Sequence, residues 1–224
     1  MEIDTVAGPA VRKRGRPVGA DSEKTRRTIV CAARDLIAER GYHSATFQQI
    51  AARAGVSRPT LHYYYASREE LYEVLLVDAR EHVDMCAAEA IRADTLLGQL
   101  GVFSAGMHRL ATAEPALMRM VVTARIDHHR GTHRHEAATA LVAAVHAFYD
   151  AVVVDAIRRG ELPPDTDAHA VADMLGALFW GLGFHAGFVG VADNDEDRSE
   201  IARQLLRLLA SGLLNSPEPA SVDA

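Results

Sequence analysis

The apolar residues of this chain recur at intervals of three and four positions along almost its whole length. Ile29, Ala33, Leu36 and Ile37, for example, all fall on one face of a helix with 3.6 residues per turn. No segment alternates apolar and polar residues between turn signals, which is the pattern of a half-buried strand. The periodicity therefore predicts an all-α protein, and 224 residues with 49% hydrophobic content are enough to bury a core.

Cap and breaker residues divide this pattern into separate helices. Asp21 or Ser22 is a suitable N-cap for the first helix, and Gly41 follows its last residue, where glycine commonly ends a helix. A proline two residues after Ser57 falls in the first turn of a short helix, where its missing N–H removes no hydrogen bond. The expected helices span residues 21–40, 46–54, 57–65, 67–85 and beyond, 95–112, 115–128, 134–159, 167–191 and 196–214.

The net charge of −6 conceals an asymmetry along the chain. Residues 1–65 contain 11 Lys and Arg against 6 Asp and Glu, whereas residues 66–224 contain 13 against 24. A basic end on an acidic body is expected where one end alone approaches phosphate. A charge-split surface that binds no DNA is the alternative, because charge by itself does not exclude it.

Two short capped helices, joined by residues 54–57, give the most specific motif in the chain. Thr46 and Ser57 are the predicted N-caps, Gly55 provides the tight turn, and Val56 provides an apolar plug between the helices. This spacing is typical of a helix-turn-helix. The second helix must then present polar side chains outward, toward phosphates and base edges. Those side chains are Ser57, Arg58, Thr60, His62 and Tyr63.

At these residues the sequence resembles the tetracycline-repressor (TetR) family. The match covers roughly residues 24–75 and includes Gly41-Tyr42, Ile50-Ala51, residues 54–57, residues 61–65 and residues 67–71. The resemblance implies that Thr46, Tyr64 and Arg68 also contact DNA, with Arg68 standing where the family usually has Lys. His62 stands where the family usually has a Tyr whose hydroxyl contacts phosphate. A three-helix packing unit that never meets DNA is the alternative.

The resemblance also implies a two-part architecture and a regulatory role. We expect a flexible basic arm (1–21), a helix-turn-helix domain (22–66), a helical-bundle domain for ligand binding and dimerisation (67–215) and a disordered tail (216–224). The expected function is a ligand-released repressor that binds a near-palindromic operator as a homodimer, although the sequence leaves activation open. The alternative is a helical small-molecule- or metal-binding protein without ligand-regulated DNA binding.

The basic arm contains Arg-Gly-Arg-Pro at residues 14–17. Arg14 and Arg16 resemble the core of AT-hook motifs, in which a thin extended chain enters a narrow A·T-rich minor groove. A basic tail with only nonspecific attraction to phosphate is the alternative.

Residues 174–192 form a stretch long enough to cross a membrane, with His185 as its only ionisable residue. Five glycines and acidic flanking residues argue against a membrane span. Four of the glycines share one helical stripe, and the resemblance implies a dimer interface here, with an intrachain core helix as the alternative. The residues expected in that interface are Gly176, Phe179, Trp180, Gly183, Gly187, Ile201, Leu205, Leu208 and Leu209.

A mainly apolar effector is expected to bind within the helical body. The resemblance and a surplus of pliable and aromatic side chains motivate this expectation, and a filled core is the alternative. The predicted lining residues are Phe103, Met107, Met118, Val122, Phe148 and Tyr149.

No catalytic, metal or cofactor motif is complete. His128, His129, His133 and His135 are interrupted by Gly131 and lack a further ligand at a recognised spacing, so a solvated loop is expected. The sequence contains neither a nucleophile elbow nor a His-Glu-x-x-His motif. The lack of these motifs predicts that the protein is not an enzyme and needs no cofactor. Two unpaired cysteines and an N-terminus without an apolar core predict a cytoplasmic protein.

Overall fold

The computed structural model describes residues 18–130, 136–189 and 195–213, and in these residues every regular element is helical. Most predicted boundaries agree with the structure to within a few residues. The elements are α1 (Val18–Arg40), α2 (Phe47–Arg53), α3 (Arg58–Tyr64), α4 (Arg68–Ala90), α5 (Leu96–Ala113), α6 (Pro115–Arg130), α7 (Glu136–Arg159), α8 (Ala168–Phe184), α9 (Asp195–Leu208) and two π-helical turns, η1 (His185–Val189) and η2 (Leu209–Leu213).

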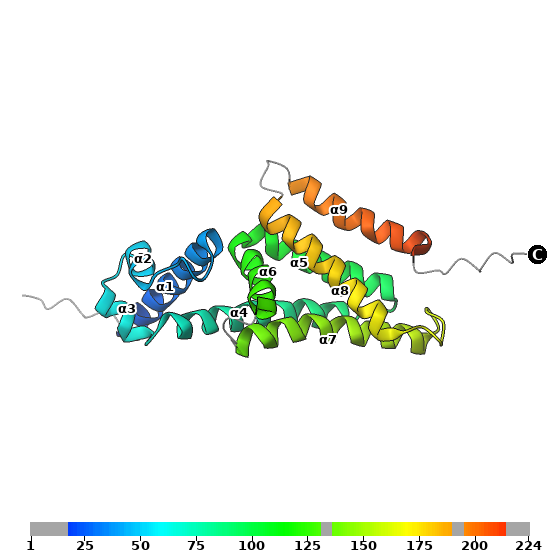
Figure 1. The fold of residues 1–224 in the computed structure, drawn as a ribbon, viewed down its shortest axis with the longest axis horizontal. Helices are drawn as coiled ribbons and strands as arrows, with labels where there is room; N and C mark the ends of the chain where they lie inside the picture. Colours follow the sequence, from blue (N-terminus) through cyan, green and yellow to red (C-terminus); the bar gives the residue numbers. More distant parts are fainter. Residues whose placement is uncertain (1–17, 131–135, 190–194, 214–224) are drawn as a thin grey trace, which may run out of the picture.

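Helices α1, α2 and α3 gather at one end of the molecule and form a head (Figure 1). Their apolar faces meet in a shared core in which Ile29, Ile50 and Leu61 are fully buried. Helix α1 ends before Gly41, whose φ of +77° is a left-handed conformation that glycine adopts without strain. The helix begins at Val18 rather than at the predicted cap, so residues 18–21 belong to α1 and not to a flexible arm.

Helix α4 leads from the head into the body and packs there against α5 and α7 (Figure 1). Helix α7 also packs against α8, and α9 lies against α5. Leu75, Leu76, Ala79 and Val83 make up the buried face of α4 and continue the core of the head into the body. One buried cluster therefore joins the two parts of the protein.

The predicted helix over residues 167–191 changes its hydrogen-bonding pattern near its end. Regular α-helix stops at Phe184, and His185–Val189 form a π-helical turn. Such widened turns recur at functional sites because they re-aim the side chains that they carry. By length and composition alone, Glu136–Arg159 and Ala168–Val189 are apolar enough to span a membrane. In the structure α7 packs between α4 and α8, so much of its apolar surface forms the core.

Candidate functional site

The first helix of the helix-turn-helix begins with a complete capping box. The Thr46 hydroxyl accepts a hydrogen bond from the Gln49 amide at 3.2 Å, and the Gln49 side-chain oxygen accepts one from the Thr46 amide at 3.0 Å. Two N–H groups that a helix start leaves unpaired are thereby satisfied. Thr46 therefore fixes the start of α2, and its side chain remains exposed.

The turn between α2 and α3 has the predicted construction. Gly55 has a φ of +67°, and no atom lies within 4 Å of a side chain placed there, so backbone conformation is the reason for glycine. The Val56 amide donates to the Ala51 carbonyl at 3.0 Å, and the half-buried Val56 side chain packs on the core. Ser57 then caps α3 by accepting from the Thr60 amide at 3.1 Å.

The outward face of α3 carries most of the predicted DNA-contacting side chains. Leu61 is fully buried and anchors the helix, whereas Arg58, His62 and Tyr63 are exposed, Tyr63 to 81%. The His62 ring lies edge-on to Phe47 of α2, with ring centroids 4.8 Å apart. A rigid polar face of this kind is suited to contacts with base edges and phosphates.

Two predicted contact residues have their hydroxyl groups hydrogen-bonded within the head. Thr60 is half-buried, with its hydroxyl oxygen 2.7 Å from that of Ser57. The Tyr64 hydroxyl donates to Ser22 of α1 at 3.3 Å, so Tyr64 joins α3 to α1. The Tyr64 hydroxyl therefore faces α1 in this structure, and its contact with DNA stays a prediction.

Arg68 was also expected to contact phosphate, but its guanidinium faces the loop between α1 and α2. Its Nη1 donates to the carbonyl oxygens of Tyr42, His43 and Ala45 at 3.3–3.4 Å. The guanidinium lies 4.3 Å from the centre of the Tyr42 ring, a cation–π contact. In this structure Arg68 is therefore a clamp between α4 and the residues that precede Thr46, and its contact with phosphate stays a prediction.

Tyr42 and Glu69 complete this clamp. The Tyr42 hydroxyl donates to Glu69 at 3.0 Å, and the ring stacks on Tyr72, with centroids 4.4 Å apart. Burial, followed by the hydrogen bond to Glu69, raises the pKa of the Tyr42 phenol, which stays protonated as a donor. Hydrogen bonding to its own backbone N–H lowers the pKa of Glu69, with the Tyr42 hydroxyl contributing further.

A second connection between head and body centres on Arg34 of α1. Its guanidinium pairs with Glu114, at the corner between α5 and α6, and lies 3.8 Å from Asp78 of α4. The Arg34 side chain is 13% exposed, and its Nε is buried without a hydrogen-bond partner in the described part of the protein. An arginine in this position depends on both carboxylates, because leaving a buried charge unpaired is strongly destabilising.

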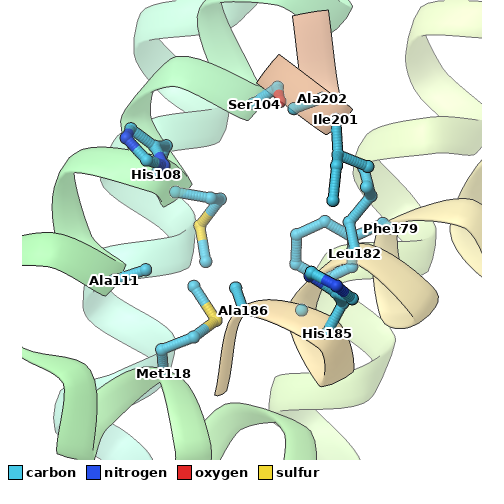
Figure 2. Close-up of a pocket in the computed structure, with 12 residues that line it drawn as sticks. Ser104, His108, Ala111, Met118, Phe179, Leu182, His185, Ala186, Ile201 and Ala202 are labelled. Carbon is cyan, nitrogen blue, oxygen red and sulfur yellow. The ribbon is translucent and has the colours of Figure 1, made fainter. Parts of the chain in front are cut away.

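The body contains a cavity, here called the methionine cavity after Met107 and Met118, with an empty volume of about 520 Å³. Figure 2 shows Met118 and Ala186 across the hollow from Ser104 and Ala202. This space includes solvent at the open side of the hollow. The other lining residues are Ser104, His108, Ala111, Phe179, Leu182, Gly183, His185, Ala186, Ile201 and Ala202.

A second hollow of about 400 Å³, here called the leucine cavity, lies next to the first. Burial raises the pKa of the Tyr149 phenol, which lines it. Its other lining residues are Leu100, Ser104, Leu175, Leu178, Phe179, Leu182, Ala202, Leu205, Leu206 and Leu209.

The structure changes the predicted pocket lining. Of the six residues expected there, only Met107, Met118 and Tyr149 line either cavity. The prediction is wrong for Phe103, Phe148 and Val122. Phe103 stacks on Phe148, with ring centroids 4.2 Å apart, and all three side chains fill the core.

Gly176, Gly183 and Gly187 pack against helices of their own protomer. The prediction that these glycines contact a second copy of the chain is therefore wrong. A Cβ placed at Gly183 lies 3.2 Å from Val122, and one at Gly187 lies 3.2 Å from Arg119, both of which are on α6. Gly176 faces α7 in the same way. The glycines permit close approach, as the sequence predicted, but the neighbouring helices belong to the same chain.

The other predicted interface residues divide between the core and the surface. Phe179 and Leu209 are buried within the protomer, which corrects their assignment, and Trp180 and Leu205 are half-buried. Ile201 and Leu208 on α9 are exposed to 40% and 55%.

A different face of α8 and η1 is apolar and exposed. It comprises Met174, Ala177, Gly181, Phe184 and Phe188, at spacings of three and four residues, with the two phenyl rings stacked. We call this set the outer stripe. Sequence reasoning missed it, although the same periodicity that revealed the glycine stripe also contains this one.

Several predicted features lie at or beyond the edge of the described residues. Arg14 and Arg16 of the arm, and His133 and His135 of the histidine cluster, lie outside those residues. His128 and His129 are exposed near the end of α6. Within the described residues, no group of three or more potential ligands could hold a metal ion.

Comparison with known proteins identifies the head. The model of the tetR family of bacterial regulatory proteins matches residues 29–75. The transcriptional activator FasR of Mycolicibacterium smegmatis is 40% identical over 62 residues, which cover 28% of this chain and 27% of FasR. This match therefore spans about a quarter of the relative.

Other similarities extend over the body. The transcriptional repressor LfrR of the same organism is 28% identical over 200 residues, covering 87% of this chain and 93% of LfrR. The structure of Salmonella enterica GusR superposes with a TM-score of 0.65 and 25% identity, covering 86% of this chain and 96% of GusR. Residues 29–75 therefore carry the region that defines the tetR family of bacterial regulatory proteins, and transcriptional regulators resemble the chain over most of its length.

Proposed function

We propose that this protein is a transcriptional repressor that inserts α3 into the DNA major groove and leaves its operator when a small molecule binds the body. The exposed polar face of α3 carries this proposal, because Leu61 and the two caps hold that face rigidly outward. LfrR, named as a repressor, is similar over most of its length, whereas FasR, named as an activator, matches only over a quarter. Repression is therefore favoured, and a regulator of this kind acts in the cytoplasm beside the chromosome.

Arg58, His62 and Tyr63 are the proposed contacts with base edges and phosphates. Ser57 and Thr60 lie beside them on the same turn, and Thr60 gains access to DNA by rotating its hydroxyl away from Ser57. A good base contact contributes about 1–3 kcal/mol of discrimination. Arg58→Ala and Tyr63→Ala should therefore weaken or relax recognition without affecting folding.

The proposed dimer uses the outer stripe, with Ile201 and Leu208 of α9 at its edge. Spacings of three and four residues let an apolar helix face interlock with an identical face on a second copy. Two heads related by such a symmetry reach successive major grooves about 34–36 Å apart, or a multiple of that distance. The operator should therefore be nearly palindromic.

Arg14 and Arg16 are proposed to add a minor-groove contact, on the sequence pattern alone. Removal of residues 1–17 should weaken operator binding and make its salt dependence shallower, since fewer counterions are released. If Arg14→Ala with Arg16→Ala reduces binding equally on A·T-flanked and G·C-flanked operators, the arm contributes only nonspecific attraction.

The methionine cavity is the proposed effector site. Its lining includes α6, whose first residue follows Glu114, the partner of Arg34 in the head. The solved structure of Bacillus subtilis FadR, of similar fold with a TM-score of 0.68, contains stearoyl-CoA. A ligand releases DNA only if it binds the non-binding arrangement more tightly, since equal affinity shifts no equilibrium.

Selection of genomic fragments by the purified full-length protein tests the proposed function. The expected result is a near-palindromic motif whose affinity falls with salt and with Arg58→Ala or Tyr63→Ala. A matched control is Val154→Ala, since Val154 is exposed on α7 in the body. Enrichment of no motif, or a motif bound equally well by the two α3 variants, would overturn the proposal.

A further inference from the structure

The methionine and leucine cavities adjoin each other along one line, here called the slot. Four residues line both of them, Ser104 of α5, Phe179 and Leu182 of α8, and Ala202 of α9. Figure 2 shows this shared boundary, with Ala202 beside Ser104 and with Phe179 and Leu182 on one flank of the hollow. A molecule that displaces the side chains of this shared wall can therefore extend from one cavity into the other. The slot follows the direction of α5 and α8, so it favours an elongated ligand.

The polar groups of the slot are concentrated at one end. His108 and His185 line the methionine cavity, and Ser104 lies at the junction. The far end is hydrocarbon, formed by Leu100, Leu175, Leu178, Leu205, Leu206 and Leu209, apart from the phenol of Tyr149. Burial raises the pKa of that phenol, which therefore stays uncharged. The far end thus disfavours a charged group, while the near end offers hydrogen bonds.

We infer that the slot binds one elongated, mainly apolar carboxylic acid per protomer, with its carboxylate between His108 and His185 and its tail among the leucines. The inference rests on the proposed function and specifies the effector that acts on it. Two imidazoles supply two N–H donors, which matches the two oxygens of a carboxylate. Neither arginine nor lysine is among the residues that line the two cavities. The slot therefore has no positively charged side chain of these types to bind a ligand head with several negative charges.

Glu200 of α9 lines a separate groove together with His185 and Ile201. Its carboxylate pairs with Arg203 at 2.6 Å and with Arg207 at 3.6 Å. The two arginines compensate its charge, and Glu200 does not line the methionine cavity itself. A carboxylate at the histidine end therefore meets donors rather than an unpaired negative charge.

Trp180 provides the means to test this inference in the full-length protein. It is the single tryptophan of the chain, half-buried on α8, with its ring 5.1 Å from that of Phe179 in the slot wall. The probes are sodium octanoate, decanoate and dodecanoate, with 1-dodecanol as the neutral counterpart, all below the concentrations at which they form micelles. Tryptophan fluorescence gives the affinity, and calorimetry gives the stoichiometry.

Dodecanoate should bind once per protomer, and affinity should rise about fourfold for each methylene added between octanoate and dodecanoate. Dodecanoate should bind at least about tenfold more tightly than dodecanol, because its head accepts charge-assisted hydrogen bonds. His108→Leu combined with His185→Leu should remove this preference and leave dodecanol binding unchanged. Equal affinity for the acid and the alcohol in the unmodified protein would overturn the inference.

A second pair of variants tests the position of the tail. Ala202→Phe places a ring at the junction of the two cavities, so it should weaken dodecanoate more than octanoate. Ala105→Phe is the matched control, because Ala105 is exposed on α5 beside Ser104 and does not line the slot. Circular dichroism checks that both variants fold. Unchanged chain-length dependence in a folded Ala202→Phe variant, or no saturable binding of dodecanoate, would also overturn the inference.

DNA binding is measured separately on the fragments that the protein selects. If DNA is selected but dodecanoate does not bind, only the inferred ligand class fails. If dodecanoate binds once per protomer but no DNA is selected, only the proposed function fails.

Discussion

Replacing Arg68 with methionine distinguishes a structural clamp from a phosphate contact. The substitution keeps an unbranched apolar stem and removes the guanidinium, which donates to three loop carbonyls and lies over Tyr42. The hydrogen bonds are long, at 3.3–3.4 Å, and the side chain is 26% exposed, so each contact contributes modestly. The cation–π contact contributes about 0.5–1 kcal/mol and the hydrogen bonds about 1 kcal/mol more, giving about 2 kcal/mol in total.

A loss of about 2 kcal/mol should lower the Tm by about 4–8 °C in a protein of this size. Thermal unfolding followed by circular dichroism measures this change. The salt dependence of operator binding is measured in parallel, because each lost phosphate contact reduces its logarithmic slope by about 0.9. For Arg68→Met we expect a lower Tm and an unchanged slope.

Arg58→Met is the matched control, since Arg58 is exposed on α3. Among the described residues its side chain forms no hydrogen bond or ion pair. It should leave the Tm unchanged and make the slope shallower by about 1.8, one contact for each subunit of a dimer. Arg68→Lys keeps the charge but loses the planar fork, so it should recover little of the lost stability. An Arg68→Met variant with normal Tm and a shallower slope would refute the clamp.

Three further predictions follow from the packing. Gly101→Ala should stabilise α5 by about 1 kcal/mol, because alanine favours a helix more than glycine does. Gly183→Ala should be at least about 1 kcal/mol less stable than the Gly101→Ala variant, because its methyl group would crowd Val122 of α6. Equal free energies of unfolding for the two variants, measured with a chemical denaturant, would contradict this. Phe184→Lys in the outer stripe should give monomers in sedimentation at micromolar concentration, whereas Val154→Lys on α7 should not, and an unchanged dimer would place the interface elsewhere. Glu114→Gln removes the charge that pairs with Arg34, so it should reduce the release of operator DNA by ligand, measured by fluorescence anisotropy. Full release by this variant would show that Glu114 does not link the methionine cavity to the head.

The helix starts could be predicted because the hydrogen bonds that fix them join residues close together in the sequence. Thr46, Ser57 and Ser67 each accept a hydrogen bond from the amide three residues ahead, which a short sequence pattern specifies by itself. The turn at Gly55 is equally local, since its left-handed backbone needs glycine whatever surrounds it. The helix-turn-helix is the best-predicted part of the site because contacts between residues near in sequence determine most of its structure.

The role of Arg68 could not be predicted in this way, because its partners lie 23 to 26 residues earlier in the chain. The loop carbonyls acquire their positions only when α4 packs beside α1. A sequence motif identifies the residue but not the direction of its side chain. The same reason explains Tyr64, whose hydroxyl reaches Ser22 across 42 residues.

The two faces of α8 illustrate a related limit. Helical periodicity places Gly183 on one stripe and Phe184 on another, and both stripes are suitable for packing. Which stripe meets α6 depends on the position of α6, a helix about 60 residues earlier in the chain. Gly176, Gly183 and Gly187 are buried in the protomer, whereas the outer stripe is an exposed apolar surface that the proposed dimer can use.

The corner between α5 and α6 joins the proposed effector site to the head. Ala111 and Met118 line the methionine cavity on either side of Glu114, which pairs with Arg34 of α1. Because the Arg34 side chain is largely buried, separating it from this carboxylate would leave a poorly solvated charge. Helix α1 must therefore follow the corner when a ligand displaces it, while Asp78 ties the same guanidinium to α4. We therefore expect the proposed effector to act on the head through two helices, to the extent that it prefers one position of this corner over the other.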